Sequence, residues 1–353
     1  MRSLFVSLIL HWIKPLAALR YSSGGVKDCG SRMLKAESLS CPLRVVQVKG
    51  FEGRANDVIY CHPLDKEPHS SAVIYFGGDV QDYPENMDHH RDNKNYMKWN
   101  LENMALLLQS KFPYSHIVVI KPSRLTTHKL ATFMDLVSAE MDQFRMEFKA
   151  FSCFDNFVRC NNCGAPVHIP THQALQHLEQ LLQTLTNRIK DAAQPLREGS
   201  CNNSFFPNGF SLDKAELQLI GFSKGCVVLN QFLYEFHYLK TLTPEDESMT
   251  SIVSRITDMY WLDGGHAGGK NTWITSRSLL ETLTRLGIKI HIHVTPYQVT
   301  DERRPWIRKE EKAFGDLLKR LGAPVERTVH FENQMANLYM HFNVLSAFKQ
   351  SSE

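Results

Sequence analysis

The chain has 353 residues, of which 43% are hydrophobic and 22% are charged, so it can bury the core of an ordinary globular enzyme. Three of its 40 basic residues lie in the first 21 positions, which contain no acid, so the rest of the chain balances its 37 acidic residues. This balance indicates no basic patch for nucleic acid. The eight cysteines fit disulfides in a secreted protein, and they fit reduced thiols equally well in a chain with this much apolar content.

The first 21 residues have the composition of a targeting segment. They contain Arg2, Lys14, Arg20 and two serines, and residues 20–23 look like a processing site. The apolar residues 3–10 are also compatible with a secretory signal. No apolar run reaches the ~18 residues of a membrane span. We therefore predict a mitochondrial targeting segment at residues 1–21 and a mature chain without a transmembrane segment.

Short runs rich in valine and isoleucine alternate with helix-like stretches, which is typical of a mostly parallel sheet covered on both faces. The expected strands are residues 43–48, 57–61, 72–76, 116–120, 217–220, 256–262, 288–294 and 326–331. The expected helices are residues 97–110, 128–150, 172–192, 226–239, 276–286 and 308–321. The pattern predicts an α/β fold with a doubly wound sheet.

The stretch from residue 121 to residue 215 is too long for a single crossover between strands. It contains two of the expected helices around a segment rich in Cys, Asn, Gly and Pro. We interpret residues 152–170 as an insertion over the edge of the sheet or over the site. The predicted organisation is one domain at residues 22–353 with a helical and loop insertion at about 121–215.

The pentapeptide Gly221-Phe222-Ser223-Lys224-Gly225 lies between an expected strand and an expected helix. In that context Gly-x-Ser-x-Gly predicts a nucleophile elbow, which presents a serine hydroxyl on a strained strand-to-helix turn. Glycines flank the serine because side chains there would collide with the neighbouring strand and helix. The alternative is a chance match in a buried turn.

A serine nucleophile needs a histidine base, and the histidine needs a carboxylate to fix its tautomer. The chain order on this fold is serine, acid, histidine. His341 follows the last expected strand by one loop, whereas His330 lies within it. Asp301 follows the strand at 288–294 and is the preferred acid, with Asp263, one strand earlier, as the alternative. The structural alternatives are a buried helix histidine and solvated or helix-capping carboxylates.

An attacked carbonyl gains negative charge, which backbone N–H groups must stabilise. Lys224, directly after the serine, supplies one such N–H in the predicted oxyanion hole. Gly77 and Gly78, directly after the strand at 72–76, are predicted to supply the second, although a glycine pair is also an ordinary turn signal.

Two further segments resemble ligand sites but match their patterns only in part. Residues 263–269 are rich in glycine without the phosphate-loop pattern, and we expect a turn that lines the pocket. A cysteine-rich segment offers zinc-compatible side chains, but their spacing is closer than in common zinc fingers. These side chains are Cys153, Cys160, Cys163, His168 and His172. We therefore expect an ordinary loop there, with no metal and no cofactor.

The segments FGGDV, GFSKG, LDGG and YMHFN are together similar to a eukaryotic family of mitochondrial α/β-hydrolase-like proteins, named in human for an open reading frame on chromosome 2. The resemblance runs from Ala72 to Phe342. It implies an α/β-hydrolase fold, a serine-hydrolase site at Ser223, a mitochondrial location in the matrix and a link to respiratory-chain upkeep.

These observations predict a serine hydrolase that cleaves an ester or thioester through an acyl-enzyme. Apolar residues between 151 and 169 are expected to form a lid or a pocket for lipid-like acyl groups. The alternative is a catalytically silent binding protein with the same fold, which holds a partner through the insertion or the surface around Trp306. Reaction with a fluorophosphonate distinguishes the two, because only an activated serine reacts.

Overall fold

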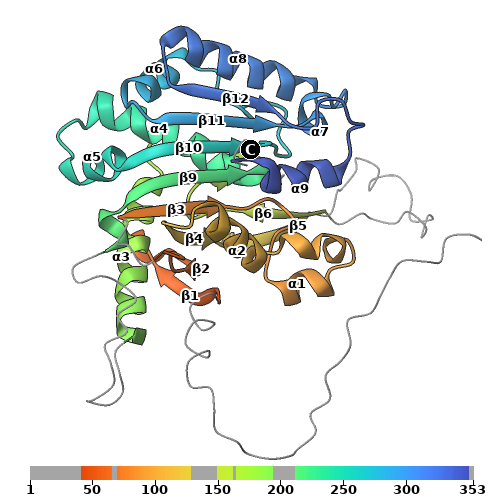
Figure 1. Ribbon diagram of the computed structural model, residues 1–353. Coiled ribbons are helices and arrows are strands. Elements are labelled where there is room, and N and C mark those ends of the chain that lie inside the picture. Colours follow the sequence, from red (N-terminus) through yellow and green to blue (C-terminus); the bar gives the residue numbers. More distant parts are fainter. Residues whose placement is uncertain (1–40, 66–69, 129–148, 162–163, 194–210, 350–353) are drawn as a thin grey trace, which may run out of the picture. The chain divides into compact units, whose positions relative to one another are not determined.

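A computed structural model describes residues 41–65, 70–128, 149–161, 164–193 and 211–349 (Figure 1). Its main sheet has the strand order β1-β2-β4-β3-β9-β10-β11-β12. These strands are β1 (Leu43–Lys49), β2 (Ala55–Cys61), β3 (Ser71–Phe76), β4 (His116–Ile120), β9 (Glu216–Phe222), β10 (Ile256–Leu262), β11 (Lys289–Val294) and β12 (Val325–Val329). Strand β2 is antiparallel to both of its neighbours, and all pairs from β4 to β12 are parallel. The predicted α/β-hydrolase-like fold is confirmed.

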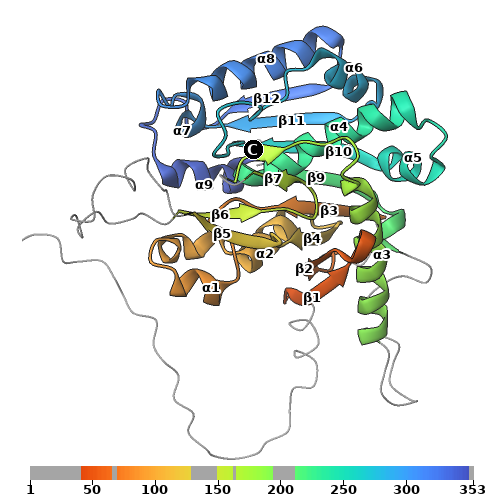
Figure 2. The same cartoon turned by 180° about the vertical axis from the view of Figure 1, so that it is seen from behind.

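Helices cover both faces of this sheet (Figures 1 and 2). They are α1 (Pro84–His89), α2 (Leu101–Lys111), α3 (Ala174–Ala193), α4 (Cys226–Leu242), α5 (Glu247–Ser254), α6 (Arg277–Arg285), α7 (Pro296–Val299), α8 (Pro305–Leu321) and α9 (Leu338–Ala347). Successive side chains of a strand point to opposite faces, so each inner strand contributes to two cores. In β3, Ile74 and Phe76 pack in the core with α3, α4, α6 and α8, and Tyr75 packs in the core with α2 and α9.

The chain order of the strands places the site. From β3 the chain crosses to β4 on one side and later to β9 on the other side of β3. Loops that leave two neighbouring parallel strands in opposite directions open a crevice at their carboxyl ends, which is where ligands bind in such sheets. Gly77 and Ser223 follow β3 and β9 at this point.

The strands expected from the sequence are all present, with ends that differ by a few residues, and the helix expected at 172–192 is α3. The helix expected at 128–150 lies mostly outside the described residues, and its two ends are wrong. The chain there forms an antiparallel hairpin of β5 (Arg124–His128) and β6 (Lys149–Cys153). Pairing between the strands overrides the local helical pattern. A second hairpin, β7 (Arg159–Cys160) with β8 (Pro166–Val167), follows it.

The predicted targeting segment at residues 1–21 lies outside the described residues, as do residues 194–210 before the nucleophile strand. Across the ranges that the structure describes, none of the helices combines the length and the apolar character needed to cross a bilayer.

Candidate active site

Ser223 occupies a strained turn between β9 and α4. Its φ angle is +51°, in the left-handed region that is costly for a residue with a side chain. A single 3₁₀ turn, Ser223–Gly225, leads directly into α4, and the serine is partly exposed. Such strain at a non-glycine residue is a feature of functional sites. The geometry is that of the elbow expected from the pentapeptide.

The two glycines of the pentapeptide are required by close backbone contacts. A Cβ atom on Gly221 would lie 2.8 Å from the Cα atom of Cys226. A Cβ atom on Gly225 would overlap the carbonyl oxygen of Phe76 at the end of β3. Both positions therefore exclude any side chain, which explains the spacing of the motif around Ser223.

His341 lies on α9 and faces the same cleft as Ser223. The cleft has a volume of about 620 Å³, and both residues line it. The imidazole ring packs against Phe222 and Tyr297, with ring centroids 4.7 and 4.9 Å away. These contacts fix the plane of a ring that is buried apart from its access to the cleft.

Asp263, at the end of β10, is the carboxylate that contacts His341. Nδ1 of His341 donates to Oδ2 of Asp263 across 2.6 Å. The backbone N–H of Thr295 donates to Oδ1, and the Thr295 hydroxyl donates to Oδ2, each across 2.7 Å. The carboxylate is fully buried, so these donors replace its lost hydration. With Nδ1 protonated, Nε2 of a neutral His341 is a proton acceptor.

Asp301 does not reach His341, which corrects the preferred assignment of the acid. Its carboxylate instead accepts hydrogen bonds from Arg303 and Arg304, with Arg304 Nε 2.9 Å from Oδ2. Although burial opposes the change, these two guanidinium groups lower the pKa of Asp301 to about 2. Asp301 thus joins a local ion pair beyond α7, and the alternative acid, Asp263, occupies the position beside the imidazole.

The cleft is formed by loops at the carboxyl edge of the sheet and by α9. Its lining combines aromatic and aliphatic side chains with polar and charged ones: Asp79, Val80, Phe222, Ser223, Gly265, His266, Ala267, Tyr297, Gln298, Arg303, Arg304, Trp306, Leu338, His341 and Phe342. The expected contribution of residues 151–169 is absent from this lining in the part of the chain that the structure describes. Phe154 and Phe157 instead pack against Phe76 in the core beneath the sheet.

The loop that was expected to supply the second oxyanion donor is held by a buried glutamine. The backbone N–H of Gly78 donates to Oε1 of Gln81 across 3.0 Å, and the Tyr75 hydroxyl donates to the same oxygen. Gln81 in turn donates to the carbonyl of Trp99. Gly78 lies beside the serine, since an added Cβ there would be 3.1 Å from the Cβ of Ser223, but its N–H already has an internal acceptor.

Lys224 contributes its backbone next to the serine, but its side chain serves the fold. The side chain is fully buried, and Nζ donates to the carbonyl oxygen of Gly164, in the turn between β7 and β8. The insertion is thus anchored to the residue that follows Ser223. An ammonium group is costly to bury, so groups near Lys224 have to supply negative charge.

The zinc-compatible residues named from the sequence do not come together as a set. Cys163 lies outside the described residues. His168 stacks on Tyr234, and His172 donates from Nε2 to the carbonyl of Asp155 across 3.0 Å. Burial lowers the pKa of His168 to about 4, so this histidine is neutral near pH 7. Neither histidine belongs to the cluster of thiols formed by Cys153 and Cys160.

Residues 263–269 form a loop that lines the cleft, as expected from the sequence. His266 is buried there, and burial lowers its pKa to about 4. Its Nδ1 atom accepts from the N–H of Gly268 across 2.9 Å. The backbone N–H of Gly265 donates to the carbonyl of Ser223, which ties this loop to the elbow.

Sequence reasoning missed Thr295 and Gln81, because their roles depend on long-range contacts. It also missed α9 as a helix, although Asn337 caps it by accepting from the N–H of Met340. An asparagine before an apolar stretch is a recognised helix start. For Asp301, the two arginines that follow within three residues are the sequence signal for a local ion pair.

Sequence comparison identifies the relatives of this chain. The family model C2orf69 matches residues 44–144, 141–209 and 192–324. The chain belongs to the C2orf69 family. The mouse relative, "Mitochondrial protein C2orf69 homolog", is 39% identical over 309 residues, which cover 78% of this chain and 77% of the mouse protein. The human member, "Mitochondrial protein C2orf69", is 37% identical over 323 residues, covering 81% and 77%. The zebrafish homolog is 35% identical over 321 residues, covering 87% and 85%.

Solved structures that overlap with this C2orf69 family member include esterases. The enterochelin esterase of Shigella flexneri gives a TM-score of 0.42 at 14% identity, covering 87% of this chain and 56% of the esterase. An esterase of Pyrobaculum calidifontis gives a TM-score of 0.39 at 9% identity, covering 90% and 87%. At these scores the overlaps carry no argument about activity, which has to come from the site itself.

Proposed function

We propose that this chain is a serine hydrolase that cleaves an ester or thioester through an acyl-enzyme. One observation carries the proposal: a strained, partly exposed serine shares a cleft with a histidine whose Nδ1 donates to a buried carboxylate. These are the three roles that nucleophilic acyl transfer requires.

In the proposed reaction, Oγ of Ser223 attacks the acyl carbonyl and Nε2 of His341 takes the hydroxyl proton. The protonated imidazole then gives this proton to the leaving group. Water enters, loses a proton to His341, and releases the acid from the acyl-enzyme. Asp263 stays ionised and stabilises the imidazolium.

The oxyanion of the tetrahedral intermediate needs donors on the side opposite His341. The N–H of Lys224 follows the nucleophile and is the first proposed donor. The N–H of Gly78 is the second, and it would have to shift its hydrogen bond from Gln81 to the substrate. The aromatic and aliphatic lining of the cleft supports an apolar acyl group.

Labelling with a fluorophosphonate tests the proposal. The wild-type chain should react at Ser223, and Ser223→Ala should abolish the reaction while changing the free energy of unfolding by less than roughly 1 kcal/mol, because only one hydroxyl is lost. An exposed serine in a regular element, Ser278 on α6, provides a control, since Ser278→Ala should leave labelling intact. Equal labelling of wild type and Ser223→Ala would contradict the assignment.

A binding protein with an unused hydrolase site is the second candidate. The hydrogen bond from Gly78 to Gln81 favours it, because a donor already satisfied inside the protein is a weaker oxyanion donor. Absence of labelling in a folded wild-type chain, together with retained binding of a partner protein, is the result that selects this candidate.

The proposed location is the mitochondrion, with the matrix as the compartment and respiratory-chain upkeep as the process. The names of the mouse, human and zebrafish relatives and the composition of residues 1–21 support the mitochondrial part. Import should remove about 21 residues, which sequencing of the amino terminus of the mature chain will show. An intact Met1 on the mitochondrial protein, or a secreted product, contradicts the predicted processing.

A further inference from the structure

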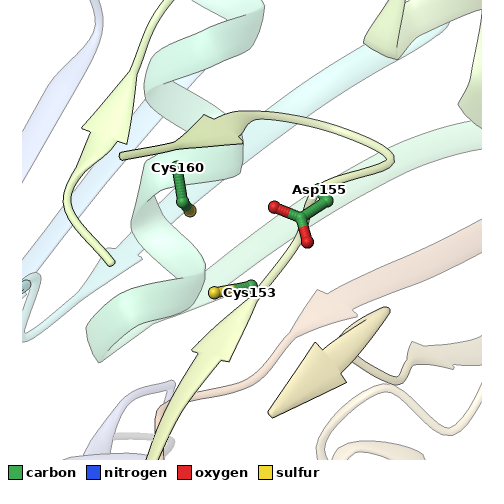
Figure 3. Close-up of side chains that lie close together, drawn as sticks. All are labelled: Cys153, Asp155 and Cys160. Atoms are coloured by element: carbon green, nitrogen blue, oxygen red, sulfur yellow. The ribbon is translucent and has the colours of Figure 1, made fainter. Parts of the chain in front are cut away.

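Two thiols and a carboxylate converge in the insertion, away from the cleft of Ser223. Cys153 ends β6, Cys160 ends β7, and Asp155 lies in the turn between them. The sulfur atoms and a carboxylate oxygen all lie within 4.8 Å of one another. Figure 3 shows the three side chains directed toward a common space.

Hydrogen bonds and packing within the protein hold the backbone between these residues. Within the turn, the carbonyl of Phe154 accepts hydrogen bonds from the N–H groups of Phe157 and Val158, at 2.7 and 2.8 Å. The rings of Phe154 and Phe157 are fully buried. His172 donates to the carbonyl of Asp155, which fixes the turn from outside. The three side chains are therefore held near one another by the fold.

The surroundings supply a positive charge without a matching acid. The ammonium group of Lys224 is fully buried, and among the described residues no carboxylate lies within ion-pair distance of it. Its Nζ atom donates to the carbonyl of Gly164, in the turn that follows Cys160. Two thiolates, one carboxylate and one divalent cation carry a net charge of about −1, which balances one buried ammonium.

We propose that Cys153, Asp155 and Cys160 bind one Zn²⁺ ion, with water as the fourth ligand. Thiolate and carboxylate together are a ligand set of zinc, and thiolates exclude Mg²⁺ and Ca²⁺. Bonds of about 2.0–2.3 Å place the ligand atoms of a tetrahedral site roughly 3.3–3.8 Å apart. Side-chain rotations that move these atoms by about 1 Å therefore bring them to the distances that zinc requires.

The carboxylate distinguishes a metal site from a redox pair of cysteines. The negative charge of a carboxylate beside the sulfur atoms disfavours the thiolate that thiol–disulfide exchange needs. Cys153 is also only 1% exposed, which hinders access by an oxidant. A cation uses all three groups at once and requires no oxidant.

The position of the site assigns it a structural role. It ties the end of β6 to the strand before the Gly164 turn, and that turn accepts the hydrogen bond from Lys224. The ion thus closes the insertion over the residue that follows Ser223. This role is independent of catalysis, because a binding protein with the same fold would keep the ion.

Metal analysis of the full chain tests the proposal. Protein purified from zinc-supplemented medium should contain about one zinc ion per chain by elemental mass spectrometry. Cys160→Ser and Asp155→Asn should reduce this content at least fivefold, and Cys41→Ser, at an exposed cysteine outside the cluster, should leave it unchanged. The melting temperature of chelator-treated protein should rise by about 5 °C when zinc is restored in excess, and that of Asp155→Asn should not.

A second measurement protects the test against variants that fail to fold. Co²⁺ added to the chelator-treated wild-type chain should produce thiolate-to-cobalt absorption in the near ultraviolet, which zinc then displaces. Absence of metal and of this absorption overturns the proposal. Equal zinc content in wild type and Asp155→Asn overturns the assigned ligand set, and a disulfide between Cys153 and Cys160 in the purified chain shows that the pair is redox-active instead.

Discussion

Replacement of Asp263 by Asn tests whether Asp263 is the acid, because it changes which nitrogen of His341 carries the proton. Asn keeps the shape of the side chain and tolerates the φ angle of +48° at this position. The backbone N–H of Thr295 can only donate, so it requires the amide oxygen at the place of Oδ1. The amide NH₂ group then faces His341, whose Nδ1 must become an acceptor. In this arrangement Nε2 carries the imidazole proton. Nε2 then cannot accept the proton of Ser223.

The size of the effect follows from the two orientations of the amide. In the orientation that satisfies Thr295, the wrong tautomer costs about 10⁴-fold in turnover, as in other serine triads, or about 5.4 kcal/mol of barrier. The flipped amide restores the correct tautomer but sets two donors against each other, at about 1–3 kcal/mol. At the upper end of this penalty, roughly one molecule in 160 carries the flipped amide, and that molecule still lacks the negative charge that stabilises the imidazolium. We therefore expect kcat to fall by roughly 10²-fold or more.

Hydrolysis of a p-nitrophenyl ester, or the rate of fluorophosphonate labelling, measures this loss. Asp301→Asn is the matched control, because it makes the same chemical change in a carboxylate that pairs with Arg303 and Arg304, and it should change kcat by only a few-fold. Melting temperatures should show that both variants fold. If Asp263→Asn keeps more than about a tenth of the wild-type rate while Asp301→Asn loses it, the assignment of Asp263 is refuted.

Two further predictions concern stability. Gly225→Ala should lower the free energy of unfolding, measured by urea denaturation, by about 3 kcal/mol or more, because the added Cβ would overlap Phe76. Gly269→Ala is the control and should be nearly neutral, because no atom lies within 4 Å of its added Cβ. Burial lowers the pKa of several histidines from 6.5 to about 3 (His116, His177 and His293) or about 4 (His168 and His266). Below pH 6.5 the unfolded chain binds protons that the folded chain does not, so stability is complete above that pH and falls by about 1.4 kcal/mol per pH unit for each such histidine. Urea titrations at pH 7.5 and 5.5 measure how steeply the free energy of unfolding depends on pH. His177→Gln should reduce this dependence by roughly one proton, and His89→Gln, at an exposed site, should leave it unchanged. A free energy of unfolding that does not change with pH contradicts the burial argument.

Local and repeating patterns in the sequence were enough to predict several parts of this protein. The alternation of strands and helices predicts the doubly wound sheet, because the spacing of apolar residues along each element indicates which of its faces are buried. The pentapeptide around Ser223 predicts the elbow, because strand, turn and helix are consecutive in the chain. His341 follows from chain order, since only one loop separates it from the last strand.

Which groups face these residues depends on contacts between distant parts of the chain, and the sequence does not reveal them. Asp263 and Asp301 both follow the ends of parallel strands, so spacing along the chain does not separate them. The choice depends on Thr295, which orients Asp263 toward His341, and on the two arginines that neutralise Asp301. The physical reason is that a buried charge is stable only with donors around it, and the chain brings those donors from distant positions.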